Sequence, residues 1–172
     1  MAEEDGLVDE AGPSLEIPLL VTEVRPGTEQ FEAVLALAAR VLAQDRHLVS
    51  LFPAAVQSRV LGAFHGPQCV GFLRYLIQVI GAEVGRPAVM HQGAPLTEGY
   101  VEAFGVAPLA RRQGIGTALQ DHAARQCRAA GCYQMRSRSP VTSAENYALK
   151  LAAGYVLHPS HDDDSYYFIK HL

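Results

Sequence analysis

Arg111-Arg112-Gln113-Gly114-Ile115-Gly116-Thr117 is the stretch that decides how this chain folds. Before it, residues 100–106 alternate as a strand would, and Pro108 ends that strand because proline cannot donate a hydrogen bond to a sheet. After it, residues 117–130 are rich in Ala, Leu and Gln and predict a helix that Gly131 closes. A loop with two glycines therefore joins a strand to the N-terminus of a helix. Unpaired backbone N–H groups and the positive end of the helix dipole meet there, which suits the loop to an anion, phosphate above all.

The spacing of this loop excludes two common phosphate-binding motifs. It lacks the Gly-Lys-Ser/Thr ending of a Walker A motif. It also lacks the third glycine of a dinucleotide-binding fingerprint, and Arg136 stands where an acidic residue would hold a ribose. The longer string, Val106-Ala107-Pro108 followed by Arg111-x-x-Gly114-x-Gly116, resembles the pyrophosphate-binding signature of the GNAT superfamily of acetyl-CoA-dependent N-acetyltransferases. The alternative is a glycine turn that only lets helix and strand pack closely.

Composition and charge are those of an ordinary globular chain. The 172 residues suffice for one domain with its own core, and 49% of them are hydrophobic and 19% charged. The net charge of −4 without a basic block argues against a nucleic-acid-binding protein. Apolar runs such as residues 73–80 are too short to span a membrane, and the acidic N-terminus does not resemble a secretory signal. Three cysteines without metal-type spacing fit reduced thiols, so we expect a cytoplasmic protein with no membrane or nucleic-acid partner.

The first half of the chain predicts an arm followed by alternating elements. Residues 1–17 contain six acidic side chains and no basic one, so we expect a flexible acidic arm before a single domain over residues 18–172. The expected elements are a strand over 19–25, a helix from Thr28 to Ala43, a short helix over 47–52, and strands over 58–65 and 68–80 joined by a turn at Gly66-Pro67. Residues 81–98 predict an unstructured connection, either an acceptor-site loop or lid or an insertion without a role.

The second half adds strands and one more helix after the glycine loop. These are a strand over 133–140, a helix that opens at the capping-box sequence Thr142-Ser143-Ala144-Glu145 and runs to Ala153, and strands over 155–158 and 165–171. A strand–helix–strand crossover implies parallel pairing, and the hairpins imply antiparallel pairing, so we expect an α/β fold with a mixed sheet. The resemblance over residues 19–172 implies the GNAT-like acyl-CoA N-acyltransferase fold, a central mixed sheet flanked by helices on both sides.

The resemblance also implies a site for acetyl-CoA as co-substrate. In the family the sheet splays open after the strand that corresponds to residues 100–106, and acetyl-CoA enters the gap. The strand's backbone is expected to pair with the pantetheine arm, and the amides of residues 112–117 are expected to hold the pyrophosphate. Arg111 and Arg112 add positive charge there, unless either is only a solvated loop residue. The residues expected to bind acetyl-CoA are Phe104, Gly105, Val106, Arg111, Arg112, Gln113, Gly114, Ile115, Gly116, Thr117, Ser143 and Asn146.

Transfer to an amine requires a base, because a lysine-like ammonium has a pKa of about 10.4. Our candidate is Glu102, which alternation puts on one face of the strand with Tyr100, Phe104 and Val106. Apolar neighbours raise the pKa of such a carboxyl group towards the range useful to a base. The family often uses a glutamate on this strand, sometimes through water. The alternative is an ion pair between Glu102 and an arginine of the adjacent strand. The N–H of Val106 is a candidate to polarise the thioester oxygen.

The departing thiolate, with a pKa of about 8.5, should receive a proton. The family commonly shows Asn, then Ala, then Tyr four residues before the Gly-Phe that follows the helix. Counting back from Gly154-Tyr155, Lys150 occupies the tyrosine position and Ser143 the asparagine position. Tyr147 lies one turn earlier, and a helix shortened by one turn would bring Asn146 and Tyr147 into these roles. We expect Tyr147 to be the donor; Lys150, water and a mere packing role for Tyr147 stay open.

Two further groups of polar residues have a structural and a functional interpretation. Arg136 and Arg138 share a strand face and either clamp an acceptor's carboxylate or pair with Glu102 or the acidic turn at residues 162–164; we favour the pairing. His158-x-x-His161-Asp162 is an incomplete ligand set for a metal, so we expect a surface turn and no metal site.

These observations predict an N-acetyltransferase that moves acetyl from acetyl-CoA directly to an amine, preferably that of a small molecule. A protein N-terminus or lysine is the alternative acceptor. A non-catalytic acyl-CoA-binding regulatory domain is the rival of another class, and Lys150 in place of tyrosine favours that rival. The sequence leaves open the identity of the acceptor, the length of the acyl chain and the oligomeric state, for which a homodimer is one option.

Overall fold

The computed structural model describes residues 17–41, 43–51 and 55–172. Almost all of the expected acidic arm, and Leu42 and Phe52 of the two expected helices, lie outside these residues. The elements that carry the fold are β1 (Leu19–Val24), α1 (Glu29–Arg40), α2 (Asp45–Val49), β2 (Ala55–His65), β3 (Gln68–Val79), β6 (Thr97–Val106), α3 (Ile115–Ala129), β7 (Gln134–Pro140), α4 (Ala144–Ala152), β8 (Val156–Pro159) and β9 (Ser165–His171).

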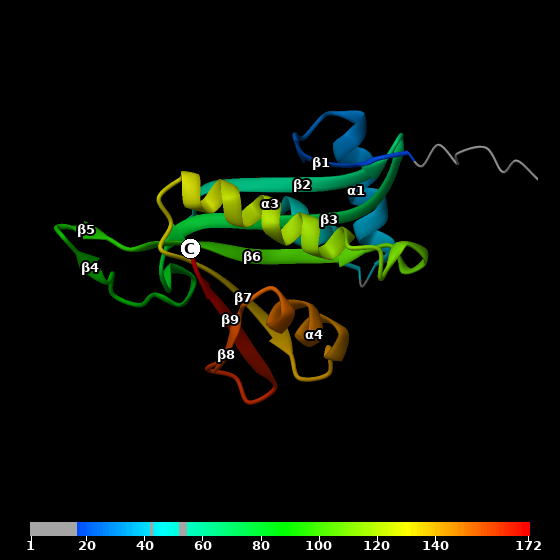
Figure 1. Cartoon of the computed structure of the whole chain (residues 1–172). Coiled ribbons are helices and arrows are strands. Elements are labelled where there is room, and N and C mark those ends of the chain that lie inside the picture. The colour runs from blue at the N-terminus through cyan, green and yellow to red at the C-terminus, as the bar shows by residue number, and fades with distance from the viewer. Residues whose placement is uncertain (1–16, 42, 52–54) are drawn as a thin grey trace, which may run out of the picture.

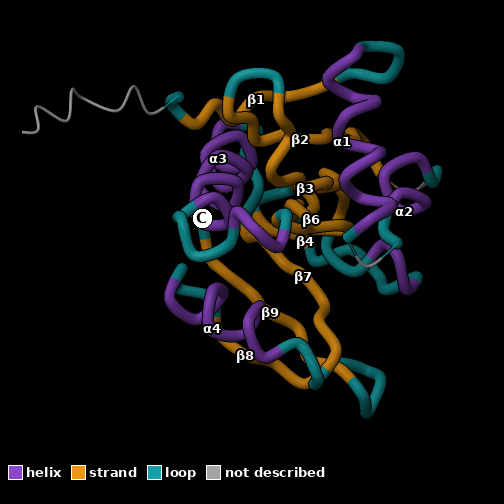
Figure 2. The backbone as a smooth tube through the Cα atoms, turned by 90° about the vertical axis from the view of Figure 1, so that its right-hand side faces the viewer, coloured by secondary structure: helices purple, strands orange, loops and turns teal. Residues whose placement is uncertain are grey.

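The strands form one seven-stranded mixed sheet, as predicted. Its order is β1-β2-β3-β6-β7-β9-β8, and β6 and β7 are its parallel pair among antiparallel neighbours. Helices α1 and α2 cover one face of the sheet, and α3 and α4 lie on the other (Figures 1 and 2). The expected fold, a mixed sheet with helices on both sides, is therefore confirmed.

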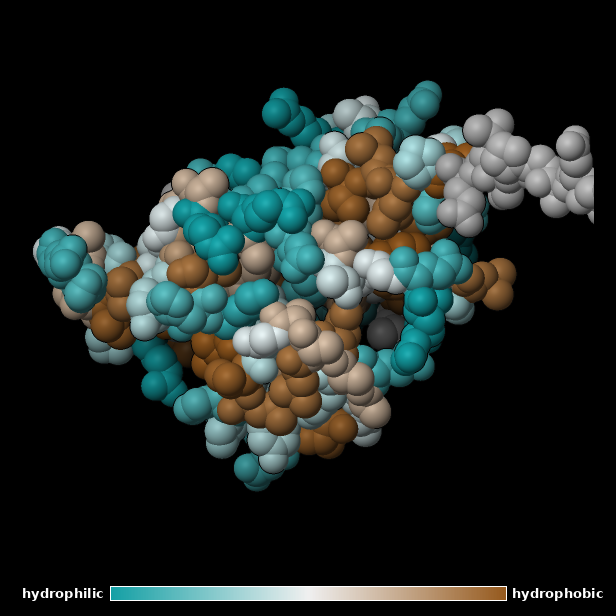
Figure 3. Space-filling view, in the orientation of Figure 1, coloured by the Kyte–Doolittle hydropathy of each residue, from teal (hydrophilic) through white to brown (hydrophobic). Residues whose placement is uncertain are grey.

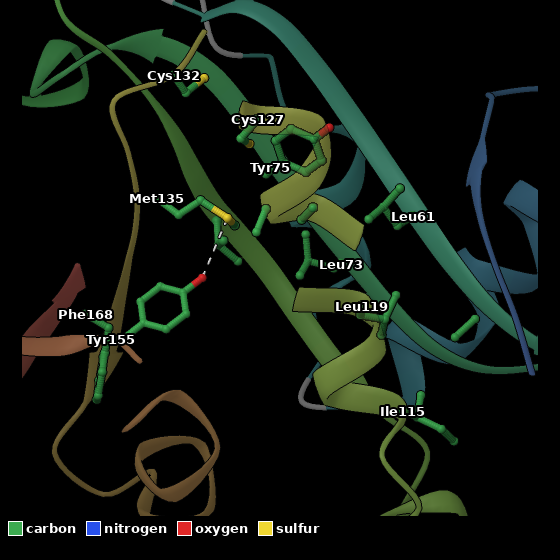
Figure 4. Close-up of a cluster of buried hydrophobic side chains, with 14 of the residues drawn as sticks. Leu61, Leu73, Tyr75, Ile115, Leu119, Cys127, Cys132, Met135, Tyr155 and Phe168 are labelled. Carbon is green, nitrogen blue, oxygen red and sulfur yellow. Dashed lines mark hydrogen bonds between the residues drawn. The ribbon is translucent and has the colours of Figure 1, made fainter. Parts of the chain in front are cut away.

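The two sheet faces bury separate apolar clusters. On the α3 side, Leu73 and Tyr75 of β3 pack with Leu119 and Cys127 of α3, and Figure 4 shows this cluster. On the α1 side, helix residues and the alternate residues of the central strands pack together, among them Phe31, Val34, Val60, Phe72 and Ala103. Strand alternation produces this division, because successive side chains point to opposite faces. The central strands β3 and β6 are thereby fixed from both sides.

Two local expectations need correction. Residues 81–98 are not an unstructured connection: they contain a short 3-10 helix, Ala82–Val84, and a small hairpin of β4 (Met90–His91) and β5 (Ala94–Pro95), and Thr97 and Glu98 already belong to β6. The capping box before α4 does not form either. Ser143 occupies the N-cap without a side-chain hydrogen bond, so Glu145 is the second helical residue and not the third, as a capping box needs. Its carboxylate pairs with the Arg111 guanidinium at 3.3 Å.

Candidate active site

The sheet opens between β6 and β7. These strands pair over only four positions, from Glu98–Gln134 to Val101–Ser137, and then diverge, as Figure 1 shows. A cavity of about 1030 Å³ fills the gap and is lined by both strands, the glycine loop, α4 and the connection between α1 and α2. Figure 3 shows the recess opening between α4 and the loop before α3.

The open edge of β6 turns backbone groups that β3 does not bond towards this cavity. Ala107 N–H donates to Val70 O at 2.8 Å, which fixes the alternation of the antiparallel ladder with β3. Gly105 and Ala103 therefore bond to β3, while the N–H and C=O groups of Phe104 and Val106 point away from it. An extended ligand can pair with such an edge as an additional strand would.

The glycine loop turns its amides into the same cavity. Gly114 has φ +78° and serves as the N-cap of α3, and the first intrahelical bond runs from Ala118 N to Gly114 O at 2.9 Å. The N–H groups of Ile115, Gly116 and Thr117 thus have no partner within the helix, which is the arrangement that binds anions. A side chain at Gly116 would come within 3.2 Å of Phe104 and 3.1 Å of Leu149, so this second glycine serves close packing.

Most residues expected to bind acetyl-CoA line this cavity. Those that do are Phe104, Gly105, Val106, Arg111, Arg112, Gly114, Ile115, Gly116, Thr117, Ser143 and Asn146, whereas Gln113 is not among the lining residues. Two buried polar atoms of the lining, Ser137 Oγ and Asn146 Oδ1, have no hydrogen-bond partner in the described part of the chain. Buried polar atoms usually have a hydrogen-bond partner, so a molecule bound in the cavity could supply one for each of these two.

Glu102 also lines the cavity, but its strand face differs from the one expected. Arg74 of β3 pairs with Ala103 and Tyr75 with Val101, so Glu102 is the extra residue of a β-bulge. The bulge interrupts the alternation. Glu102 contacts α2, whereas Phe104 packs in the cluster on the α3 side, so the two do not share one face.

The polar partner of Glu102 is a histidine that the sequence did not indicate. His47 Nδ1 of α2 lies 3.2 Å from Glu102 Oε1, and the two side chains are 38% and 15% exposed. Burial raises the pKa of Glu102, while His47, Arg74 and Arg138 lower it in part. Arg74 holds α2 in place, since its guanidinium donates to the carbonyl oxygens of His47 and Ser50. Burial thus raises the pKa of Glu102, as we expected from the sequence.

Gln44 is a second lining residue that the sequence did not indicate. Its Nε2 donates to Phe104 O at 3.2 Å, and its Oε1 accepts from Phe104 N at 3.0 Å. A single side-chain amide thus occupies both free backbone groups of Phe104. Neither Gln44 nor His47 belongs to a periodic pattern, and both reach β6 across more than fifty residues of chain, so no local signal could have identified them.

The two arginines of β7 have structural partners. Arg136 is buried, donates to Glu98 from Nε at 2.9 Å and from Nη2 at 2.6 Å, and also pairs with Glu83. Tyr100 and Tyr167 hold its guanidinium between their rings, each centroid 4.7 Å away. Arg138 pairs with Asp162, as the structural interpretation predicted. The alternative of a direct ion pair between Glu102 and either arginine is therefore not found.

Helix α4 presents Lys150 to the cavity instead of Tyr147. The Tyr147 ring packs edge-on against Phe168 at 4.8 Å and is not among the lining residues. Lys150 lines the cavity and is 1% exposed, and burial lowers its pKa to about 7. We expected a helix shortened by one turn to bring Tyr147 to the site, and Tyr147 does not line the cavity. Asn146 reaches the cavity but donates to Ser139 Oγ at 2.6 Å.

The described residues contain no group of three or more His, Cys, Asp or Glu side chains placed to hold a metal ion. Nor does any helix among them have the length and apolar character needed to cross a membrane.

Comparison with known proteins agrees with this architecture. Among solved structures, Arabidopsis thaliana NAA60 in complex with a bisubstrate analogue is 13% identical with a TM-score of 0.69, covering 90% of this chain and 98% of that one. PaiA N-acetyltransferase from Thermoplasma acidophilum in complex with coenzyme A is 12% identical (TM-score 0.65, coverage 90% and 99%). The ribosomal-protein-S18-alanine N-acetyltransferase of Escherichia coli is 16% identical (TM-score 0.59, coverage 88% and 91%).

At such identities the structures establish the fold, and the family rests on sequence. A search of curated protein sequences found no match. The family model for the acetyltransferase (GNAT) family matches residues 30–155, which include β6, the glycine loop, α3, β7 and α4. The chain therefore belongs to the GNAT acetyltransferase family.

Proposed function

We propose that this protein transfers an acetyl group from acetyl-CoA directly to the amine of a small molecule. The observation that carries the proposal is one continuous cavity that joins the free amides at the start of α3 to the open edge of β6 and to Glu102. The first of these suits a pyrophosphate, the second the amides of a pantetheine arm, and the third an amine that must lose a proton.

Glu102 is the proposed base. Its carboxylate lies in the cavity wall beside His47, and its pKa is raised by burial, so it accepts a proton more readily than an exposed glutamate. The N–H of Val106, which points away from β3, is the proposed donor to the thioester oxygen as negative charge develops.

Lys150 is the proposed proton donor to the departing thiolate, in place of Tyr147. Its side chain is part of the cavity wall, and burial lowers its pKa to about 7. That value lies below the pKa of about 8.5 of a free thiol, so transfer from the ammonium to the thiolate is favourable.

A protein acceptor is the second candidate, because structurally similar enzymes include one named for acetylating an alanine of ribosomal protein S18. The choice between the two acceptors is testable. Release of CoA thiol should be measured with a panel of small amines and, separately, with peptides bearing free N-termini or lysines. Turnover on peptides alone would reverse the preference, and binding without turnover on either would favour a regulatory acyl-CoA-binding domain.

The acetyl-CoA site itself can be tested without an acceptor. Gly114→Asp should abolish acetyl-CoA binding in calorimetry, because it puts a carboxylate where backbone must approach pyrophosphate. Aspartate tolerates a positive φ better than most residues and is a good N-cap, so the helix should persist. Gly131→Asp is the matched control: it has the same φ of +78°, equally open surroundings, and lies beyond the other end of α3. Equal affinities of the two folded variants would refute the proposed site.

A further inference from the structure

Lys150 combines three properties in one side chain. It lines the cavity, it is almost completely buried, and its Nζ lies 4.5 Å from the ring centroid of Tyr155 and 6.0 Å from that of Phe104 on the open strand. Figure 4 shows the Tyr155 hydroxyl directed at the sulfur of Met135. The amine of Lys150 is thus a buried group between α4, α3 and the strand edge that is proposed to hold the pantetheine arm.

Within the described part of the chain, this amine has no charged partner that would keep it protonated. Among the described residues its one hydrogen-bond acceptor is Gln120 Oε1 at 3.3 Å, and no carboxylate lies within ion-pair distance. Burial lowers the pKa of Lys150 to about 7, so both the free amine and the ammonium are populated near neutral pH. A free amine in the wall of an acyl-CoA cavity is a nucleophile held next to an electrophile.

The surroundings of Nζ also suit the amide that acylation would create. Gln120 is 2% exposed, and its Nε2 has no hydrogen-bond partner in the described structure, while its Oε1 accepts from both Lys150 and Tyr155. An acetylated lysine has one N–H and one C=O. In the trans amide these two groups point in opposite directions, so only one of them can meet Gln120. The C=O can accept from the unpartnered Nε2, which satisfies an atom that the free lysine leaves unsatisfied.

We propose that Lys150 is a self-acetylation site of this protein, modified by acetyl-CoA bound in its own cavity when no acceptor amine is present. The neutral Nζ attacks the thioester carbonyl carbon, a C–N bond forms, the C–S bond breaks, and the proton lost by the nitrogen converts the leaving thiolate to CoA thiol. The product is a neutral acetyl-lysine that no longer donates a proton to a thiolate. This inference rests on the proposed acetyl-CoA site, and the modified enzyme should be slower in transfer to other amines.

The chain is well suited to the test because Lys150 and Lys170 are its only lysines. The full chain is incubated with isotopically labelled acetyl-CoA without acceptor, and the label is located by peptide mass spectrometry. Lys150 should carry the label and Lys170, on β9, should not. The rate should rise with pH through about 7 and then level off, whereas an exposed lysine would keep accelerating towards a pH of about 10.4.

Two variants separate this inference from its alternatives. Lys150→Arg should lose the label. Gln120→Glu, which keeps the shape and adds a carboxylate beside Nζ, should hold the lysine as ammonium and slow labelling at neutral pH. Label on Lys170 to the same extent, or an unchanged labelling rate in Gln120→Glu, would overturn the proposal. Calorimetry on the same samples distinguishes the two failures. If acetyl-CoA binds but Lys150 stays unlabelled, only self-acetylation is refuted. If acetyl-CoA does not bind, the proposed acetyl-CoA site is refuted as well.

Discussion

At the scale of single residues, the bulge in β6 decides what Glu102 can do. The extra residue turns its carboxylate towards His47, and burial raises the pKa of Glu102 while the charge and hydrogen bond of His47 partly restore it. His47→Phe should therefore raise the pKa of Glu102 further, because it removes the partner that favours the ionised form. The acidic limb of the pH–rate profile should move to higher pH, since the base is then protonated over a wider range.

This shift can be measured before the acceptor is known. Carboxyl carbon NMR of glutamate-labelled protein follows the titration directly, and Glu102→Gln identifies the resonance. His122→Phe is the control, because His122 lies on α3 and has no contact with Glu102. A Glu102 resonance that titrates at the same pH in His47→Phe and wild type would show that His47 does not tune the base.

At the scale of elements, the connection between α1 and α2 lines the cavity and also competes with a ligand for the backbone of β6. Gln44 fills both free backbone groups of Phe104 with one amide, as a bound pantetheine or peptide amide would. Gln44→Ala should therefore tighten acetyl-CoA binding, by roughly 2–10-fold if one hydrogen bond of about 0.5–1.5 kcal/mol is released to the ligand. Calorimetry against Gln57→Ala, an exposed glutamine on β2, checks this; weaker binding in Gln44→Ala would mean that Gln44 contacts the ligand instead of competing with it.

The elements that sequence predicts best are those whose signal is local. The α3 helix, its glycine loop, and β9 lie close to the positions expected from periodicity, and the glycine spacing led to the family. The β-bulge, Gln44 and His47 could not be predicted, because each depends on which residue of a distant segment lies opposite. Counting back from Gly154 predicted Lys150 at the family's tyrosine position, and Lys150 does line the cavity. Nothing local showed that Tyr147 would pack against β9 instead.

At the scale of the whole molecule, the sheet consists of two parts joined by a short parallel contact. Strands β1, β2, β3 and β6 form one part and β7, β9 and β8 the other, and the ladder between them covers only four pairs. Arg136 of β7 crosses this joint to Glu98 of β6 and to Glu83 of the segment once expected to be unstructured, while Gln78 and Gln134 donate to Glu98 as well. This network joins the two parts along the segment over which β6 and β7 pair.

Arg136→Met should destabilise the protein strongly, by about 3–5 kcal/mol near neutral pH, because it leaves the buried carboxylate of Glu98 without its counter-charge. Arg138→Met is the matched control, two residues further along β7. The exposed ion pair of Arg138 with Asp162 should contribute about 0–1 kcal/mol to stability.

The pH dependence of the stability identifies the cause of the loss. In the wild type, burial raises the pKa of Glu98, but the hydrogen bond and charge of Arg136, with Gln134 and Gln78, outweigh it and hold that pKa below its usual value. The ionised Glu98 therefore stabilises the wild type at pH values above its pKa in the unfolded chain, about 4.3. This contribution is lost as the pH falls through the lower pKa of Glu98 in the folded protein. Without Arg136, burial is opposed only by the hydrogen bonds of Gln134 and Gln78, and the pKa of Glu98 should rise. Acidification should therefore relieve the variant while it weakens the wild type. Denaturant unfolding at pH 7 and pH 5 should show the difference in stability shrinking at the lower pH; a constant difference would mean that Arg136 acts through packing between Tyr100 and Tyr167 and not through its charge.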